Sequence, residues 1–126
     1  MKTFSAVALL VSILSVPVLA TDVDHYKAKP STDLKSALCN LQSHDADLKA
    51  MISNNPMKVE DLAKLHQMTY TMEVAVQKVQ QELVKAAESL EKVHKASEVL
   101  AGDKVKVNAP DYLNITQLLT SGVECK

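Results

Sequence analysis

The fold is decided by residues 57–101, which read MKVEDLAKLHQMTYTMEVAVQKVQQELVKAAESLEKVHKASEVLA. Apolar residues recur every three or four positions and neither Gly nor Pro interrupts the run, so the pattern predicts one long helix. They occupy the a and d positions of a heptad repeat: Leu62, Leu65, Met72, Val76, Val79, Leu83, Ala86, Leu90, Val93 and Leu100. Thr69 and Ser97 are its polar a positions. Such a helix would extend roughly 65 Å, so other segments must cover its apolar seam.

A shorter helix is predicted before the long one, over about residues 32–53. Ser31 or Thr32 can cap its start, because both side chains offer an oxygen to the first free backbone N–H groups. Its apolar stripe is interrupted in the middle by His44 and Asp45. Because they occupy the apolar register, these two polar side chains are expected to pair with polar groups on a neighbouring helix.

The connection between the two helices is the turn-rich cluster of residues 53–56. Asn55 can cap the long helix with Pro56 in its first position, or the helix begins nearer Val59. A connection this short makes the helices antiparallel neighbours. Residues whose numbers sum to about 110 should then lie at similar heights. The first helix would cover the long one only as far as Val79.

The C-terminal segment is expected to cover the rest of the long helix. Gly102 is predicted to end that helix in the C′ position. Residues 103–110 look extended, since Val105 and Val107 alternate with polar residues. A short helix is predicted over about residues 111–120. The sequence thus indicates an all-α fold, an elongated helical hairpin or three-helix bundle around one long central helix.

The two cysteines, Cys39 and Cys125, are expected to form a disulfide. If the C-terminal segment doubles back along the long helix, Cys125 reaches the level of Met72, which Cys39 also faces. An isolated cysteine pair in an oxidising compartment is typically bridged.

Such a compartment is indicated by residues 1–20, which have the features of a signal peptide. Lys2 is a basic start, residues 6–14 are apolar, and a small-residue cleavage site ends at Ala20. A membrane anchor is the alternative, but Pro17 and two serines interrupt the apolar run and no basic flank follows it. We expect residues 21–126 to form a single exported domain that is not inserted in the membrane.

Composition excludes nucleic-acid binding. The chain has 14 basic and 15 acidic residues and no Trp, and all its basic residues are lysine. Beyond the signal peptide, only Tyr26, Tyr70 and Tyr112 are available for stacking on bases. Proteins that bind nucleic acids normally have a basic face with arginines or aromatic platforms.

Catalysis and cofactors are not indicated either. Gly102 and Gly122 are the only glycines, so a glycine-rich phosphate loop is absent. Ser97 has His94 and Glu98 nearby in sequence, but it lies on a continuous helix without a strained turn or an oxyanion-forming loop. We expect no enzyme and no cofactor.

One pair of residues suggests a metal site. His44 and His66 should face one another across the hairpin with Asp45 adjacent, as imidazoles do in the metal sites of helical bundles. The thioethers of Met68 and Met72 would suit copper, and the imidazoles would suit zinc. The alternative is a polar layer that fixes the register of the helices, with methionines filling gaps between them.

Three blocks of the sequence carry a resemblance: HYKAKP (25–30), LHQMTYTME (65–73) and LEKVHKASE (90–98). In them the chain resembles a family of small exported all-helical proteins of Gram-negative bacteria, classed as a domain of unknown function. The resemblance implies an all-helical fold and a periplasmic location, and it implies no activity.

The long helix with thin covers leads to the prediction of function. An apolar seam left exposed is a natural partner surface. The sequence therefore predicts a non-catalytic periplasmic binding protein with a protein partner or a second copy of itself. The alternative is a copper- or zinc-binding protein that uses His44 and His66.

Overall fold

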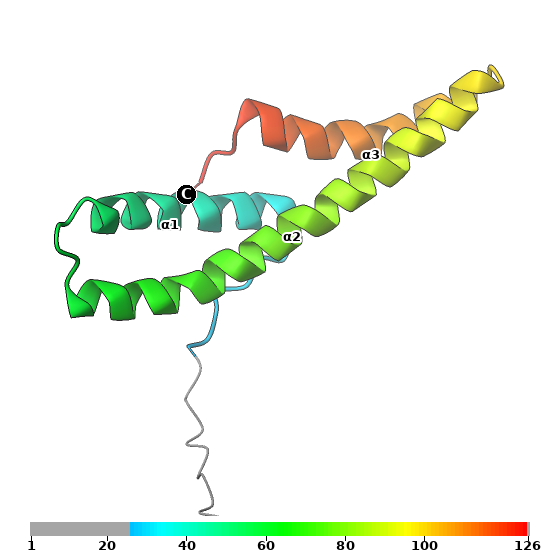
Figure 1. Cartoon of the computed structure of the whole chain (residues 1–126). Helices are drawn as coiled ribbons and strands as arrows, with labels where there is room; N and C mark the ends of the chain where they lie inside the picture. The colour runs from blue at the N-terminus through cyan, green and yellow to red at the C-terminus, as the bar shows by residue number, and fades with distance from the viewer. Residues whose placement is uncertain (1–25, 126) are drawn as a thin grey trace, which may run out of the picture.

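The computed structural model describes residues 26–125, which form three α-helices and no strand (Figure 1). They are α1 (Leu34–Ile52), α2 (Val59–Glu98) and α3 (Gly102–Ser121). The 40-residue α2 is the long central rod. The α1 helix packs antiparallel on its first half, and α3 runs back along its second half. The all-α bundle predicted from the sequence is confirmed; the predicted signal peptide lies outside the described residues.

The start of α1 is set by Asp33, and the predicted caps Ser31 and Thr32 are therefore wrong by one or two residues. An Asp33 carboxylate oxygen accepts a hydrogen bond from the Ser36 backbone N–H at 2.7 Å, and the Ser36 hydroxyl accepts one from the Asp33 N–H at 3.1 Å. This reciprocal capping box lowers the pKa of Asp33, chiefly through the Ser36 backbone hydrogen bond. Ser31 serves another purpose, because its hydroxyl accepts from the Asn40 amide at 3.0 Å.

Two buried polar side chains fasten the segment that precedes α1. The Lys29 backbone N–H donates to the Thr71 hydroxyl at 3.0 Å, and the Asn40 amide donates to the Pro30 carbonyl at 3.2 Å. Thr71 and Asn40 are almost fully buried. Their polar atoms are paired, as buried polar groups must be, so the extended segment is an integral part of the α1–α2 junction.

The long helix begins at Val59, the later of the two predicted starts. Asn55 and Pro56 belong to the preceding loop and are joined by a cis peptide bond. Asn54 bridges this loop to the first turn of α2 through its amide, which donates to Asp61 at 3.2 Å. From Val59 the helix continues without a break to Glu98.

The turn between α2 and α3 differs from the prediction for Gly102. The residue in the left-handed conformation is Leu100, with φ of 55°. Its N–H donates to the Ser97 carbonyl and the Ala101 N–H donates to the Ala96 carbonyl, which is the Schellman pattern. Leu100 therefore occupies the C′ position, and Gly102 is the first residue of α3.

This turn yields a stability prediction. Replacing Leu100 with glycine should raise the free energy of unfolding by about 1 kcal/mol, because a leucine in the left-handed region is strained. Little packing is lost, since Leu100 is 92% exposed. Urea unfolding followed by circular dichroism measures the change. In the control, Leu113→Gly inside α3 should lower the free energy of unfolding. An equal loss of stability in Leu100→Gly would contradict the proposed backbone strain at Leu100.

The C-terminal helix is twice as long as predicted, since residues 102–110 are helical and not extended. Half-buried residues continue at helical spacing through this region: Val105, Asn108, Ala109, Tyr112, Ile115, Thr116 and Leu119. Pro110 lies inside the helix and removes one backbone hydrogen bond. Residues of α3 both before and after Pro110 pack on α2. This packing keeps the helix continuous through the proline.

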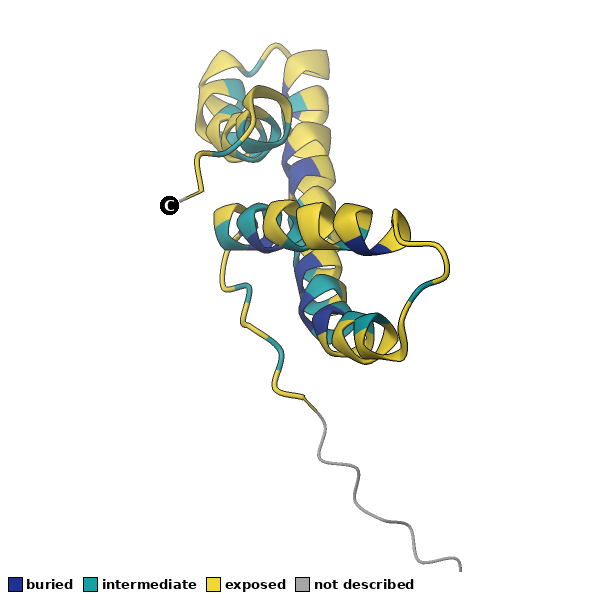
Figure 2. Cartoon of the chain, turned by 90° about the vertical axis from the view of Figure 1, so that its left-hand side faces the viewer, coloured by how far each residue is buried: buried dark blue, intermediate teal, exposed yellow. Residues whose placement is uncertain are grey.

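The buried positions of α2 form a narrow seam along one side of the helix (Figure 2), and most of them are small residues. Its buried members are Met68, Thr71, Ala75, Ala86, Ser89 and Ala96. The heptad repeat is real, but four of these six residues lie at the position before a, Ala86 lies at d, Thr71 lies at the position before d, and none lies at a. Small side chains at these positions let α1 and α3 approach α2 closely. The larger side chains of the a positions would increase the distance between the helices.

The predicted a positions consequently face outward. Leu62, Val76, Leu83 and Leu90 are each 44–51% exposed. The prediction that these residues form the covered seam is therefore wrong, although their d neighbours such as Met72, Val79 and Val93 are at least half-buried. Both covering helices lie on one side of α2, and an apolar edge is left on the other.

Candidate functional site

The disulfide joins Cys39 in α1 to Cys125 in the tail after α3, as predicted. The two Cα atoms are 5.4 Å apart and the residues are separated by 86 positions. The α1 and α3 helices pack mainly on α2 and touch one another only slightly. The disulfide is therefore the principal tie between the two covering helices.

The predicted metal ligands on α1, His44 and Asp45, have different surroundings. The His44 ring is 23% exposed, and its Nδ1 lies 4.0 Å from a carboxylate oxygen of Asp47. That Nδ1 atom is buried without a hydrogen-bond partner. Asp45 is exposed and lines a shallow groove between α1 and the end of α3. Asp47, three residues after His44, was missed although its helical spacing could have indicated it.

The predicted ligands on α2 have other surroundings. His66 is exposed and meets Tyr70 edge-on, with ring centroids 5.2 Å apart and its Nε2 3.4 Å from the tyrosine hydroxyl. Met68 is buried in the seam and Met72 is half-buried. Among the described residues, no three His, Cys, Asp or Glu side chains are grouped closely enough to hold a metal ion. Metal binding by His44 and His66 stays a prediction.

A cluster of charges crosses the middle of α2. The Glu82 carboxylate accepts hydrogen bonds from Lys78 at 2.7 Å and Lys85 at 2.8 Å. The Lys78 and Glu82 side chains are only 17% and 13% exposed. The two lysine hydrogen bonds lower the pKa of Glu82, and Lys78 also helps to lower that of Asp33. Lys78 thus acts electrostatically on a carboxylate of α2 and on the one that caps α1.

These ion pairs predict an acid-sensitive contribution to stability. The folded pKa of Glu82 lies below its ordinary value of 4.5, so the stabilisation is present above that pH and is lost as the pH falls through the folded pKa. Replacing Glu82 with glutamine should lower the free energy of unfolding by about 1.5 kcal/mol at pH 7. The difference from the unaltered protein should shrink in acid.

Urea unfolding at neutral and acidic pH checks this expectation. Glu88→Gln is the matched control, because Glu88 is exposed on the same helix and its substitution should change stability by less than about 0.5 kcal/mol. If Glu82→Gln lowered the free energy of unfolding equally at both pH values, the charge of the Glu82 carboxylate would not be the source of the stabilisation.

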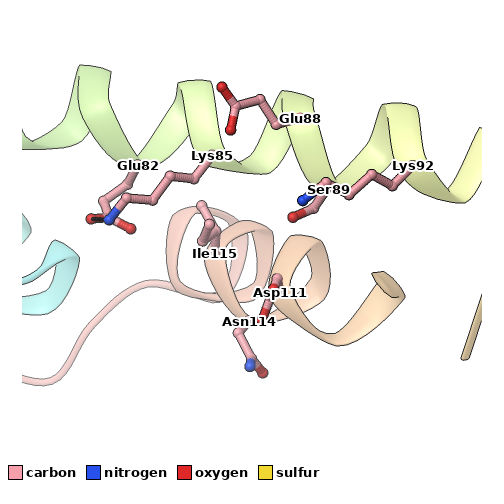
Figure 3. Close-up of a pocket in the computed structure, with 8 residues that line it drawn as sticks. All are labelled: Glu82, Lys85, Glu88, Ser89, Lys92, Asp111, Asn114 and Ile115. Atoms are coloured by element: carbon pink, nitrogen blue, oxygen red, sulfur yellow. Dashed lines mark hydrogen bonds and ion pairs between the residues drawn. The ribbon is translucent and has the colours of Figure 1, made fainter. Parts of the chain in front are cut away.

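A groove of about 430 Å³ lies between α2 and α3 next to this cluster (Figure 3). Ile115 points from α3 toward α2, and charged groups of both signs surround it. The lining residues are Glu82, Lys85, Glu88, Ser89, Lys92, Asp111, Asn114 and Ile115. Ligand pockets are typically lined by apolar and aromatic side chains, so this groove is a weak candidate for a small-molecule site.

The stronger candidate is the uncovered edge of α2, which we call the outer strip. It consists of Val76, Gln77, Gln80, Leu83, Val84, Ala87 and Leu90, all of them exposed. None carries a charge, although 23% of the whole chain is charged. Depletion of charge around exposed apolar residues is characteristic of the centre of a protein interface.

Family comparison confirms the classification as a domain of unknown function that the resemblance implied. Residues 1–121 match the group described as "Family of unknown function (DUF6746)". The chain belongs to this family. Comparison of this DUF6746 protein with curated proteins and with solved structures gave no match.

No helix within residues 26–125 is both long enough and apolar enough to span a bilayer. The exposed leucines and valines of the outer strip are spread along one edge of α2, on the side away from its buried seam. Such an edge suits a protein surface with a similar apolar stripe.

Proposed function

We propose that this protein is a non-catalytic helical binding module, exported to the periplasm, which presents the outer strip of α2 to a protein partner. The observation that carries the proposal is the uncharged apolar edge centred on Leu83, which is 48% exposed. Four large apolar residues of α2 lie along it: Val76, Leu83, Val84 and Leu90. Contiguous apolar surface of this kind typically marks an interaction site.

The rest of the fold supports this role. The α1 and α3 helices hold the opposite side of α2, and the Cys39–Cys125 disulfide ties them to one another. A surface presented by a fixed frame loses little conformational entropy on binding. The disulfide is also of the kind that persists in oxidising compartments such as the periplasm, in agreement with the signal peptide predicted at residues 1–20.

A photo-crosslinking experiment tests the proposal. A photoreactive amino acid is introduced at Gln80, in the centre of the outer strip, and separately at Lys106, an exposed position on α3. Both proteins are expressed with their native leader and irradiated in cells. We expect a discrete protein adduct from position 80 that disappears when Leu83→Glu is added, and none from position 106. The absence of an adduct at position 80 would overturn the proposal.

Metal binding is the second candidate, and one observation favours it. The buried Nδ1 of His44 has no hydrogen-bond partner, and an imidazole nitrogen without a partner is free to bind a metal. Native mass spectrometry with added zinc or copper distinguishes the two functions. A stoichiometric metal that is lost in His44→Ala/His66→Ala would establish the second candidate, whereas our preferred function predicts no such metal.

A further inference from the structure

We propose that the partner of the outer strip is a second copy of this chain, packed antiparallel through α2 about a two-fold axis beside Leu83. The inference rests on the proposed function, because it names the partner of the same surface. Figure 2 shows that the side of α2 away from α1 and α3 is exposed along its length. A second copy can therefore approach without displacing either covering helix.

The spacing of the apolar residues is symmetric. Val76, Leu83 and Leu90 are seven residues apart, in equivalent heptad positions on the same edge. In an antiparallel pair centred beside Leu83, residues whose numbers sum to about 167 come to the same height. Leu83 then meets Leu83 of the second copy, and Val76 meets its Leu90. Every large apolar a residue in the middle of α2 gains an apolar partner.

The neighbouring positions fit the same register. On one flank, Gln80 comes level with Ala87 of the second copy, so a long side chain faces a short one. Farther round the helix, Val84 faces Val84 across the axis, and Gln77 faces Glu91. A two-fold interface is self-complementary by construction, and this register places no acidic residue opposite another.

Charge distinguishes the antiparallel pair from a parallel one. Glu73 and His94 are both exposed and occupy equivalent heptad positions at the two ends of the strip. The antiparallel register brings Glu73 level with His94 of the second copy. The His94 Nε2 lies 3.3 Å from Glu98 of its own chain, and its other ring nitrogen can hydrogen-bond to Glu73 at either end of the interface. A parallel, in-register pair would place Glu73 against Glu73 and Glu91 against Glu91, which is unfavourable.

The contact is small. From Glu73 to His94 the strip is about 33 Å long, and it offers seven exposed, uncharged residues from each copy, against about 20–30 residues a side in a standard interface. Stable complexes usually bury about 1,200–2,000 Å². We therefore expect a reversible dimer whose population depends on concentration, with a dissociation constant on the order of 10 μM.

Sedimentation velocity of the purified protein, from about 1 to 300 μM, tests the inference by bracketing the dissociation constant expected for so small an interface. We expect a shift from monomer to dimer over this range. Leu83→Glu places two carboxylates together on the axis and should leave a monomer at every concentration. The matched control is Leu113→Glu on α3, where an exposed leucine undergoes the same change; this variant should still dimerise. Circular dichroism verifies that both variants are folded.

A second variant tests the register itself. Val84→Cys is introduced, the native disulfide is allowed to form, and the protein is then oxidised mildly. Because Val84 faces its own copy, an intermolecular disulfide should form readily, whereas Val59→Cys at the exposed start of α2 should not crosslink. A protein that remains monomeric throughout, or a dimer that Leu83→Glu does not dissociate, would overturn the inference. If position 80 then crosslinks to a different protein, the proposed function stands without the dimer.

Discussion

Replacing Cys125 with serine should lower the free energy of unfolding by about 4 kcal/mol, among the largest effects of any single substitution in this chain. The disulfide closes a loop of 86 residues, and in the chain-entropy model a loop of that length restricts the unfolded chain by this amount. Because α1 and α3 touch only slightly, little else holds the tail and the end of α3 to α1. Urea unfolding followed by circular dichroism measures the loss.

The reduced protein is the internal control for this experiment. Reduction of the native disulfide should bring the unaltered protein to the same stability as the Cys125→Ser variant, and should have no effect on the variant. Hydrogen exchange should quicken at the end of α3, near Leu118 and Leu119, and much less in the middle of α2. A variant that keeps its stability to within about 1 kcal/mol would show that packing alone holds the tail.

The disulfide was predictable, although the predicted conformation of the segment before Cys125 was partly wrong. The sequence suggested that residues 103–110 climb as an extended chain, whereas they are helical and shorter. Residues 122–125 follow the helix without forming a further turn of it, and they carry the chain on to α1. Cys125 therefore still reaches Cys39.

The extended reading of residues 103–110 failed for a physical reason. Val105 and Val107 alternate with lysines, and Pro110 usually ends a helix. Alternation over so few residues also fits a helix in which one valine packs and the other is exposed; Val107 is in fact 77% exposed. Contact with α2 decided between the two conformations, and contact between distant segments is not visible in a local pattern.

The heptad repeat of α2 was predictable, but the direction of its buried face was not. Large apolar residues dominate a hydrophobic pattern, so the stripe through Leu83 and Leu90 was taken for the core. Ala75, Ser89 and Ala96 contribute little to such a pattern, yet they are among the most buried residues of the helix. The same error explains why the outer strip was found only in the structure.

The directions of the His44 and His66 side chains were likewise not predictable from the sequence. The prediction placed His44 opposite His66 from the lengths of the helices alone, with Asp45 beside them. Which way a side chain points depends on rotation of the helix about its axis, and the seam is rotated by one heptad position. His66 consequently stands on the exposed surface beside Tyr70, and the carboxylate near His44 is Asp47.

The rotated seam leads to the second large effect. Replacing Ala75 with leucine should lower the free energy of unfolding by about 3 kcal/mol, because a larger side chain must force α1 away from α2 or adopt a strained rotamer. Ala75 has no exposed surface, and neither has Ala37 of α1. Their numbers sum to 112, so the antiparallel register places them at nearly the same height, where the two helices cross.

Ala87→Leu is the matched control, since it makes the same change on the outer strip of the same helix. Ala87 is exposed, so its substitution should alter stability by less than about 0.5 kcal/mol. Thermal and urea unfolding of both variants, at a concentration where the protein is monomeric, compare the two faces directly. If the a and d positions formed the covered seam, Ala75→Leu would be tolerated and Leu83→Ala would be costly. The structure requires the reverse, because Ala75 is enclosed and Leu83 is half exposed.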